Sequence, residues 1–140
     1  MLTLSQTTGY AILALAYLAE RPQCYSLAQD IARETGIRKP YLSKMLHSLA
    51  QKGLIDSKRG VKGGVVLSRP PEKISILDIL QAVEGDKPNG RCVLGLLKCS
   101  SDCPCPLHPY WSRERQRIER RLGRTTLAQV MLSVRQGWGL

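Results

Sequence analysis

The sequence predicts a mostly α-helical fold with a small β-hairpin wing, in which a winged helix-turn-helix is followed by a long C-terminal helix. Three observations support this prediction. Apolar residues recur at helical spacing between recognisable helix caps in the first half of the chain. A glycine-rich turn at 60–64 separates two short runs that favour β-structure. An arginine-rich segment with a narrow apolar seam begins near Pro109 and predicts the long helix.

The first two helices are predicted between residues 8 and 34. Segment 8–20 is apolar and almost uncharged, which indicates a buried helix, and Pro22 ends it because proline disfavours helical backbone in the residue before it. Ser26 and Gln29 have the spacing of a capping box. A second helix is therefore expected to begin at Ser26 and to run through Glu34.

The third helix is expected to start at Lys39 or Pro40, because proline is tolerated in a first turn, and to stop at Gly53. Its apolar residues have the spacing i, i+3, i+4, i+7, which places them on one inward face. They are Leu42, Met45, Leu46 and Leu49.

Strands at 54–59 and 65–68 form the predicted hairpin, and its glycines are also consistent with a simple tight turn. Ser75 with Asp78 predicts a capped helix over 76–84. Thr125 or Thr126 is expected to cap a last helix that runs toward Val134. The predicted organisation is a DNA-binding domain at 1–85, a cysteine-rich loop at 86–108 and a C-terminal pair of helices at 109–140.

Positive charge is concentrated in the segment 38–69. The formal net charge of the chain is +10. This segment holds eight Lys or Arg residues against one acid, Asp56. Such a field attracts polyanions, so nucleic acid or an acidic membrane surface is the expected partner, and a solvated basic face is the alternative. No stretch approaches the apolar length of a bilayer span, and no signal peptide is evident, so the expected compartment is the cytoplasm.

The exposed side chains of the third helix and the wing suit contact with double-stranded DNA. A recognition helix needs an apolar face for docking and a polar first turn to reach base edges, while basic residues on a wing reach phosphates or a groove. Each side chain taken singly is equally consistent with a solvated surface. The predicted DNA-binding residues are Lys39, Pro40, Tyr41, Ser43, Lys44, His47, Arg59 and Lys62.

Four of the five cysteines lie within 14 residues and indicate a metal or redox site. They are Cys92, Cys99, Cys103 and Cys105, and His108 follows closely. Thiolates are soft ligands for iron–sulfur clusters, copper(I) or zinc. A zinc site made by the last three cysteines and the histidine, or a set of free thiols, are the alternatives. The fifth, Cys24, is expected to be a small packing residue.

The segments LSQTTGYAILALAYLA, IRKPYLSKMLHSLAQKGLI and RGVKGGVVLSR, followed by DILQAVEG and CPLHPYW, resemble the IscR/NsrR/RirA family of winged-helix regulators. The resemblance covers nearly the whole chain. It implies a homodimer held by a long dimerisation helix over about 109–122, with DNA contacts from the third helix and from Arg59. It also implies a [2Fe–2S] cluster held by Cys92, Cys99, Cys105 and His108. Cys103 is an alternative ligand, and a [4Fe–4S] cluster or zinc is an alternative cofactor.

The function expected from the sequence is that of a DNA-binding transcriptional regulator, acting as a repressor, whose DNA affinity is controlled by an iron–sulfur cluster that senses iron, redox or nitric oxide status. A zinc- or thiol-based regulator is one alternative. A small iron–sulfur electron carrier is another, although it has no use for a recognition helix and wing. An enzyme is not expected, because the chain has neither a G-x-S-x-G motif nor a phosphate-binding glycine loop.

Overall fold

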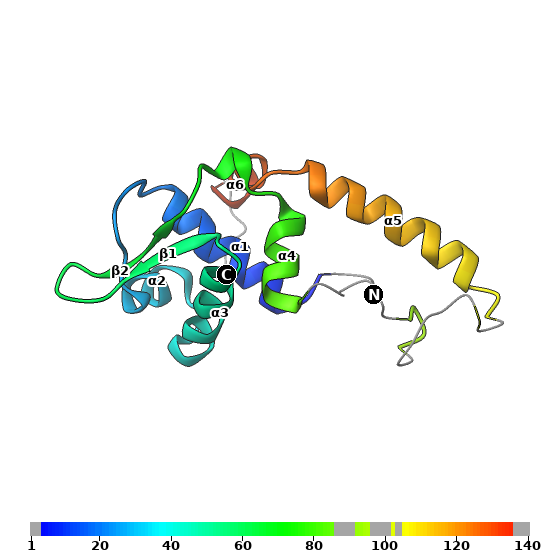
Figure 1. Cartoon of the computed structure of the whole chain (residues 1–140), viewed down its shortest axis with the longest axis horizontal. Helices are drawn as coiled ribbons and strands as arrows, with labels where there is room; N and C mark the ends of the chain where they lie inside the picture. Colours follow the sequence, from blue (N-terminus) through cyan, green and yellow to red (C-terminus); the bar gives the residue numbers. More distant parts are fainter. Residues whose placement is uncertain (1–3, 86–91, 96–101, 103–104, 136–140) are drawn as a thin grey trace.

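The computed structural model of the chain describes residues 4–85, 92–95, 102 and 105–135 (Figure 1). These residues form α-helices, one short 3₁₀ helix and one antiparallel β-hairpin. The predicted fold class, mostly α-helical with a small β wing, is confirmed. No helix within the described ranges is long and apolar enough to cross a lipid bilayer.

Helices α1 (Gln6–Ala19), α2 (Ala28–Thr35), α3 (Lys39–Gln51) and α4 (Ile76–Glu84) build the main body. Helix α1 lies at its centre, because Ala11, Ala14, Leu15 and Leu18 are fully buried there. Most α1 residues are apolar, so this helix buries several sides at once and packs against α2, α3 and α4.

Helix α4 begins as predicted from its capping box. The Asp78 backbone N–H donates to Ser75 Oγ at 3.0 Å, and the Ser75 N–H donates to Asp78 Oδ2 at 2.9 Å. These bonds satisfy backbone donors that a helix N-terminus otherwise leaves unpaired. A 3₁₀ helix, η1 (Pro71–Lys73), precedes α4 and was not predicted.

The expected capping box at Ser26 and Gln29 is wrong. Helix α2 begins at Ala28, Leu27 occupies the cap position, and no side chain caps it. Ser26 is buried and instead pairs with Val65, each backbone N–H donating to the other's carbonyl at 2.9 Å. The loop before α2 is therefore extended backbone bound to the wing, and this non-local pairing takes the residue that sequence assigned to the cap.

The wing consists of β1 (Ile55–Lys58) and β2 (Gly64–Leu67), which pair antiparallel from Ile55 opposite Leu67 to Lys58 opposite Gly64. It projects from the helical body beyond α2 and α3 (Figure 1). Gly64 has φ of +135°, and a Cβ there would lie 2.5 Å from the Ser26 carbonyl oxygen. Only glycine allows the wing to approach the backbone of Ser26 this closely.

Helices α5 (His108–Arg124) and α6 (Leu127–Arg135) follow the cysteine loop. Helix α6 returns to the body, where Leu127 is fully buried and the Leu127 N–H donates to the Ile74 carbonyl at 2.8 Å. Thr126 rather than Thr125 forms the cap, since its Oγ1 accepts from the Gln129 N–H at 3.3 Å. The body therefore holds the C-terminal end of α5, while the other end of α5 extends away from it (Figure 1).

We predict that Gly64→Ala lowers the free energy of unfolding by about 1–3 kcal/mol, because alanine strains a positive φ and meets the Ser26 carbonyl. Gly9→Ala is the matched control. Gly9 lies in α1 with open space around its Cα, so this change is expected to stabilise the chain by about 0.5–1 kcal/mol. Urea denaturation of both variants measures the difference. Equal effects would show that the contact between Ser26 and the wing is unimportant.

Candidate nucleic-acid interface and cysteine loop

Helix α3 docks on the body through the apolar face that the sequence predicts. Leu42, Met45, Leu46 and Leu49 are each at most 6% exposed. Most of the remaining residues of α3 are exposed, as expected for an amphipathic helix at a surface. The first turn of α3 therefore presents its polar residues outward.

The exposed face of α3 carries six of the predicted DNA-binding residues, and Tyr41 among them is 40% exposed. Lys39, Pro40, Ser43, Lys44 and His47 are all exposed. Ser43 Oγ donates to the Lys39 backbone carbonyl at 3.0 Å, which holds the serine side chain against its own helix. The structure thus brings these residues together as one surface, with two cationic side chains around the first turns.

Tyr41 differs from the other predicted residues of α3 because its side chain contacts α1. Its hydroxyl forms a hydrogen bond with Thr7 Oγ1, and its ring lies edge-on to Tyr10 with the ring centroids 5.7 Å apart. Gln6 Nε2 also donates to the Tyr10 hydroxyl at 2.8 Å. Thr7 and Tyr10 were not predicted as part of this region, since no local pattern relates the start of α1 to α3.

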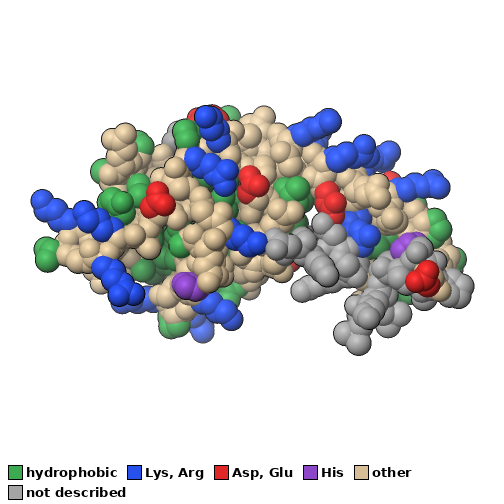
Figure 2. All heavy atoms as spheres, in the orientation of Figure 1, with side chains coloured by type: hydrophobic (Ala, Val, Ile, Leu, Met, Phe, Trp, Pro, Cys, Tyr) green, Lys and Arg blue, Asp and Glu red, His purple; other side chains and the backbone are tan. Residues whose placement is uncertain are grey.

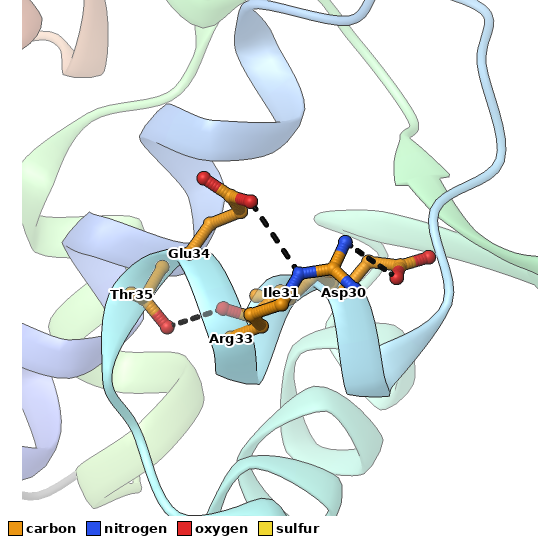
Figure 3. Close-up of polar contacts among 5 residues, drawn as sticks. All are labelled: Asp30, Ile31, Arg33, Glu34 and Thr35. Atoms are coloured by element: carbon orange, nitrogen blue, oxygen red, sulfur yellow. Dashed lines mark hydrogen bonds and ion pairs between the residues drawn. The ribbon is translucent and has the colours of Figure 1, made fainter.

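Helix α2, which precedes α3, carries two acidic residues and one basic residue beside the interface (Figure 3). Arg33 Nη2 lies 3.1 Å from Asp30 Oδ1, and Arg33 Nε lies 3.6 Å from Glu34 Oε1. These exposed ion pairs contribute little stability. They do place a guanidinium between the two carboxylates of α2. Thr35 Oγ1 donates to the Ile31 carbonyl at 2.6 Å just before the turn that leads to α3.

The wing tip presents Arg59, Lys62 and a fully exposed Val61 to solvent. At the last residue of β1, Lys58 Nζ lies 5.9 Å from the centroid of the Tyr25 ring. In Figure 2, Lys and Arg side chains gather at the wing end of the molecule, and another row lies over α5. Recognition helix and wing therefore form one basic end, as the charge distribution of the sequence predicts.

The described part of the cysteine loop contains three of the predicted ligands. Cys92 and Cys105 are free thiols and half-buried, and half-buried His108 is the first residue of α5. The His108 N–H donates to the Cys105 carbonyl at 3.1 Å, so these two residues share a turn. Cys99 and Cys103 lie outside the described residues. Among the residues that are described, no three His, Cys, Asp or Glu side chains are grouped to hold a metal.

The expectation that Cys24 is a packing residue is wrong, because Cys24 is exposed. It follows Gln23, which has a positive φ of 62°. The turn after α1 therefore places Cys24 on the surface, two residues before Ser26, which pairs with the wing.

Helix α5 leaves its apolar residues largely uncovered. None of its 17 residues is buried, although Trp111 and Leu122 are half-buried. Ile118 is 45% exposed and Tyr110 is 67% exposed. A single chain thus leaves the predicted apolar seam of this helix, which consists of Trp111, Ile118 and Leu122, only partly covered.

A family model described as Rrf2, iron-dependent transcriptional regulator, matches residues 4–133. The chain belongs to the Rrf2 family. A protein of Aquifex aeolicus (strain VF5), named as a candidate HTH-type transcriptional regulator, is 33% identical over 129 residues, covering 91% of this chain and 90% of that protein. The predicted resemblance is confirmed, and the chain is a transcriptional regulator and not an enzyme.

Two solved structures of regulators resemble this Rrf2 protein along nearly its whole length. CymR (YrzC), the global cysteine regulator of B. subtilis, is 26% identical with a TM-score of 0.76, covering 95% of this chain and 98% of that one. T. potens IscR is 24% identical with a TM-score of 0.73, covering 99% and 93%. The likeness to IscR, at this identity, is one of fold.

We predict that Lys44→Ala and Arg59→Ala each weaken binding to double-stranded DNA and reduce its salt dependence. Each phosphate contact that is lost lowers the slope of log K against log salt by about 0.9. Arg113→Ala on α5 is the control, and we expect it to leave the slope unchanged. Fluorescence anisotropy at salt concentrations from about 50 to about 300 mM measures this slope for each variant. Equal slopes for all three variants would contradict the interface.

Proposed function

We propose that this Rrf2 protein is a cytoplasmic, homodimeric repressor that binds double-stranded operator DNA and whose affinity is set by an iron–sulfur cluster. The cluster responds to iron, redox or nitric oxide status. The observation that carries the proposal is the juxtaposition of two features. A basic recognition helix and wing occupy one end of the body, and a cysteine loop joins α4 of the same body to the protruding helix α5.

The donor set of the loop fits such a cluster. Cys92 and Cys105 are free and partly accessible, and His108 follows Cys105 by one turn at the start of α5. With Cys99 they would supply three thiolates and one imidazole, and Cys103 is the alternative ligand. When bound, a [2Fe–2S] cluster supplies an oxidant-sensitive link between these residues, and an imidazole ligand raises its potential. A [4Fe–4S] cluster is the alternative nuclearity.

The uncovered face of α5 supports a homodimer. Most of the stability of a helix in a protein comes from packing of its apolar face against other parts of the structure. A second copy of the chain supplies that packing if two α5 helices lie against each other through Ile118 and its neighbours. We accordingly assign 1–85 to DNA binding, 86–108 to sensing and 109–140 to dimerisation. The spacing of the two α3 helices then sets the spacing of the DNA half-sites.

A zinc- or thiol-based regulator is the second candidate function. It is favoured by the likeness to CymR, whose name describes it as a cysteine regulator, and by the free thiols in the described residues. The two candidates share the DNA interface and the dimer. They differ in whether the loop cysteines hold iron and sulfide, zinc, or no metal at all.

We predict that protein purified anaerobically absorbs visible light and contains iron and sulfide in matched amounts. Ultraviolet–visible and circular dichroism spectra, with iron, sulfide and zinc assays on one sample, make this measurement. The band pattern and iron content separate the two cluster types. Colourless protein that holds stoichiometric zinc would replace the cluster with the second candidate.

Cys92→Ala is expected to lose cluster iron and to bind operator DNA with an affinity changed by about tenfold or more, which corresponds to 1.4 kcal/mol. Cys24→Ala is the matched control, because Cys24 is an exposed thiol outside the loop. Anisotropy with the duplex that the wild-type holoprotein selects from a random library measures the affinity. Unchanged affinity and sequence preference in the Cys92 variant would refute control by a cluster.

Ile118→Glu is expected to weaken self-association by about a hundredfold or more, since an unpaired charge in an interface costs several kcal/mol. Val61→Glu puts the same charge on the fully exposed wing tip and should leave the oligomeric state unchanged. Light scattering coupled to size exclusion gives the molar mass. A wild-type monomer at micromolar concentration, or a dimeric Ile118 variant, would contradict the α5 interface.

A further inference from the structure

The last residue of α4 is tied to the first turn of α1. Glu84 Oε1 accepts hydrogen bonds from Ser5 Oγ and, at 2.6 Å, from Thr8 Oγ1. Thr8 is fully buried, and its hydroxyl donates to the Glu84 carboxylate at the edge of the core. Hydrogen bonds to an ionised acceptor are shorter and stronger than those between neutral groups. Glu84 is separated from the cysteine loop, which starts at 86, by a single residue.

The same turn of α1 is tied to the recognition helix. Thr7, which adjoins Thr8, forms a hydrogen bond through Oγ1 with the Tyr41 hydroxyl in the first turn of α3. The ring of Tyr10, one turn further along α1, contacts the ring of Tyr41 at an interplanar angle of 84°. The two consecutive threonines therefore reach two different helices.

The first turn of α1 is itself capped by Ser5. Ser5 Oγ accepts from the Thr8 backbone N–H at 3.2 Å and so caps the helix, while it also donates to Glu84. A displacement of Glu84 thus acts on the capping residue and on the buried threonine together. Because Thr7 lies between them in the chain, a shift of this turn would also displace the hydroxyl that pairs with Tyr41.

We propose that Glu84 and Thr7 are positioning residues, which couple the end of α4 to the DNA-reading end of α3 through the first turn of α1. This proposal rests on the proposed function, in which the cysteine loop controls DNA affinity. The loop continues directly from α4, so Glu84 is the residue through which a change in the loop first reaches the DNA-binding body. Tyr41 then acts through its hydroxyl by orienting the turn that carries Ser43 and Lys44.

The test is a double-mutant cycle on DNA affinity with the full chain. Glu84→Gln keeps the size of the side chain and removes its charge. Tyr41→Phe and Thr7→Val each remove one hydroxyl of the hydrogen bond between Thr7 and Tyr41. Thr125→Val is the matched control, because Thr125 Oγ1 donates only locally, to the Arg121 carbonyl at 2.9 Å, among the bonds described for it.

Each protein is measured as purified anaerobically and again after iron removal with a chelator. The probe is the duplex selected from a random library by the wild type, and a scrambled duplex gives non-specific affinity. Hydrogen–deuterium exchange at 39–44, compared with 28–35, separates a local change in α3 from general loss of stability.

The expected result is that Glu84→Gln and Tyr41→Phe each weaken specific binding by about fivefold, and that the double variant is no weaker than the single variants. Thr7→Val should match Tyr41→Phe, exchange should rise at 39–44 but not at 28–35, and scrambled DNA should bind as before. Fully additive effects, or unchanged affinity in both single variants, would overturn the proposal.

Failure of the proposed function gives a different result. If chelation leaves wild-type affinity unchanged, control by the loop metal is wrong. The cycle between Glu84 and Tyr41 still decides whether the two ends are coupled, because it needs no metal. If chelation changes wild-type affinity but the cycle is additive, the loop acts on DNA binding by another route, and the coupling through α1 is wrong.

Discussion

Burial of the apolar face of α3 is the interaction on which the rest of the structure depends. Four side chains of this helix are at most 6% exposed and lie in the core with residues of α1 and α4. Burying an aliphatic side chain contributes about 1.5–3 kcal/mol. This packing, more than any single polar contact, fixes which side of α3 faces solvent and therefore which residues can reach DNA.

Two further constraints connect this packing to function. The pairing of Ser26 with Val65 attaches the wing to the start of the helix-turn-helix, so wing and recognition helix form one basic surface. The return of α6 to the body anchors only the C-terminal end of α5. The rest of α5 thus extends away from the body together with the end of the cysteine loop. In this position a second chain can cover the apolar seam of α5.

Local signals in the sequence predict much of this fold because their physical causes are local. The capping box at Ser75 and Asp78 and the apolar spacing in α3 each depend on residues within two turns of one another. The same method fails at Ser26, which has the right local spacing for a cap but a partner 39 positions away in sequence. The exposure of Cys24 has a different cause, because it follows a backbone turn with a positive φ at Gln23 that no sequence pattern indicates.

The sequence by itself determined the fold class, the basic segment and the inward face of α3, because composition and helical periodicity act over short distances. Only the tertiary structure decided that Thr7 meets Tyr41 and that Ser5 and Thr8 meet Glu84. Hydroxyl and carboxylate side chains pair with whatever the packing of distant helices brings within reach. No pattern along the chain records that choice.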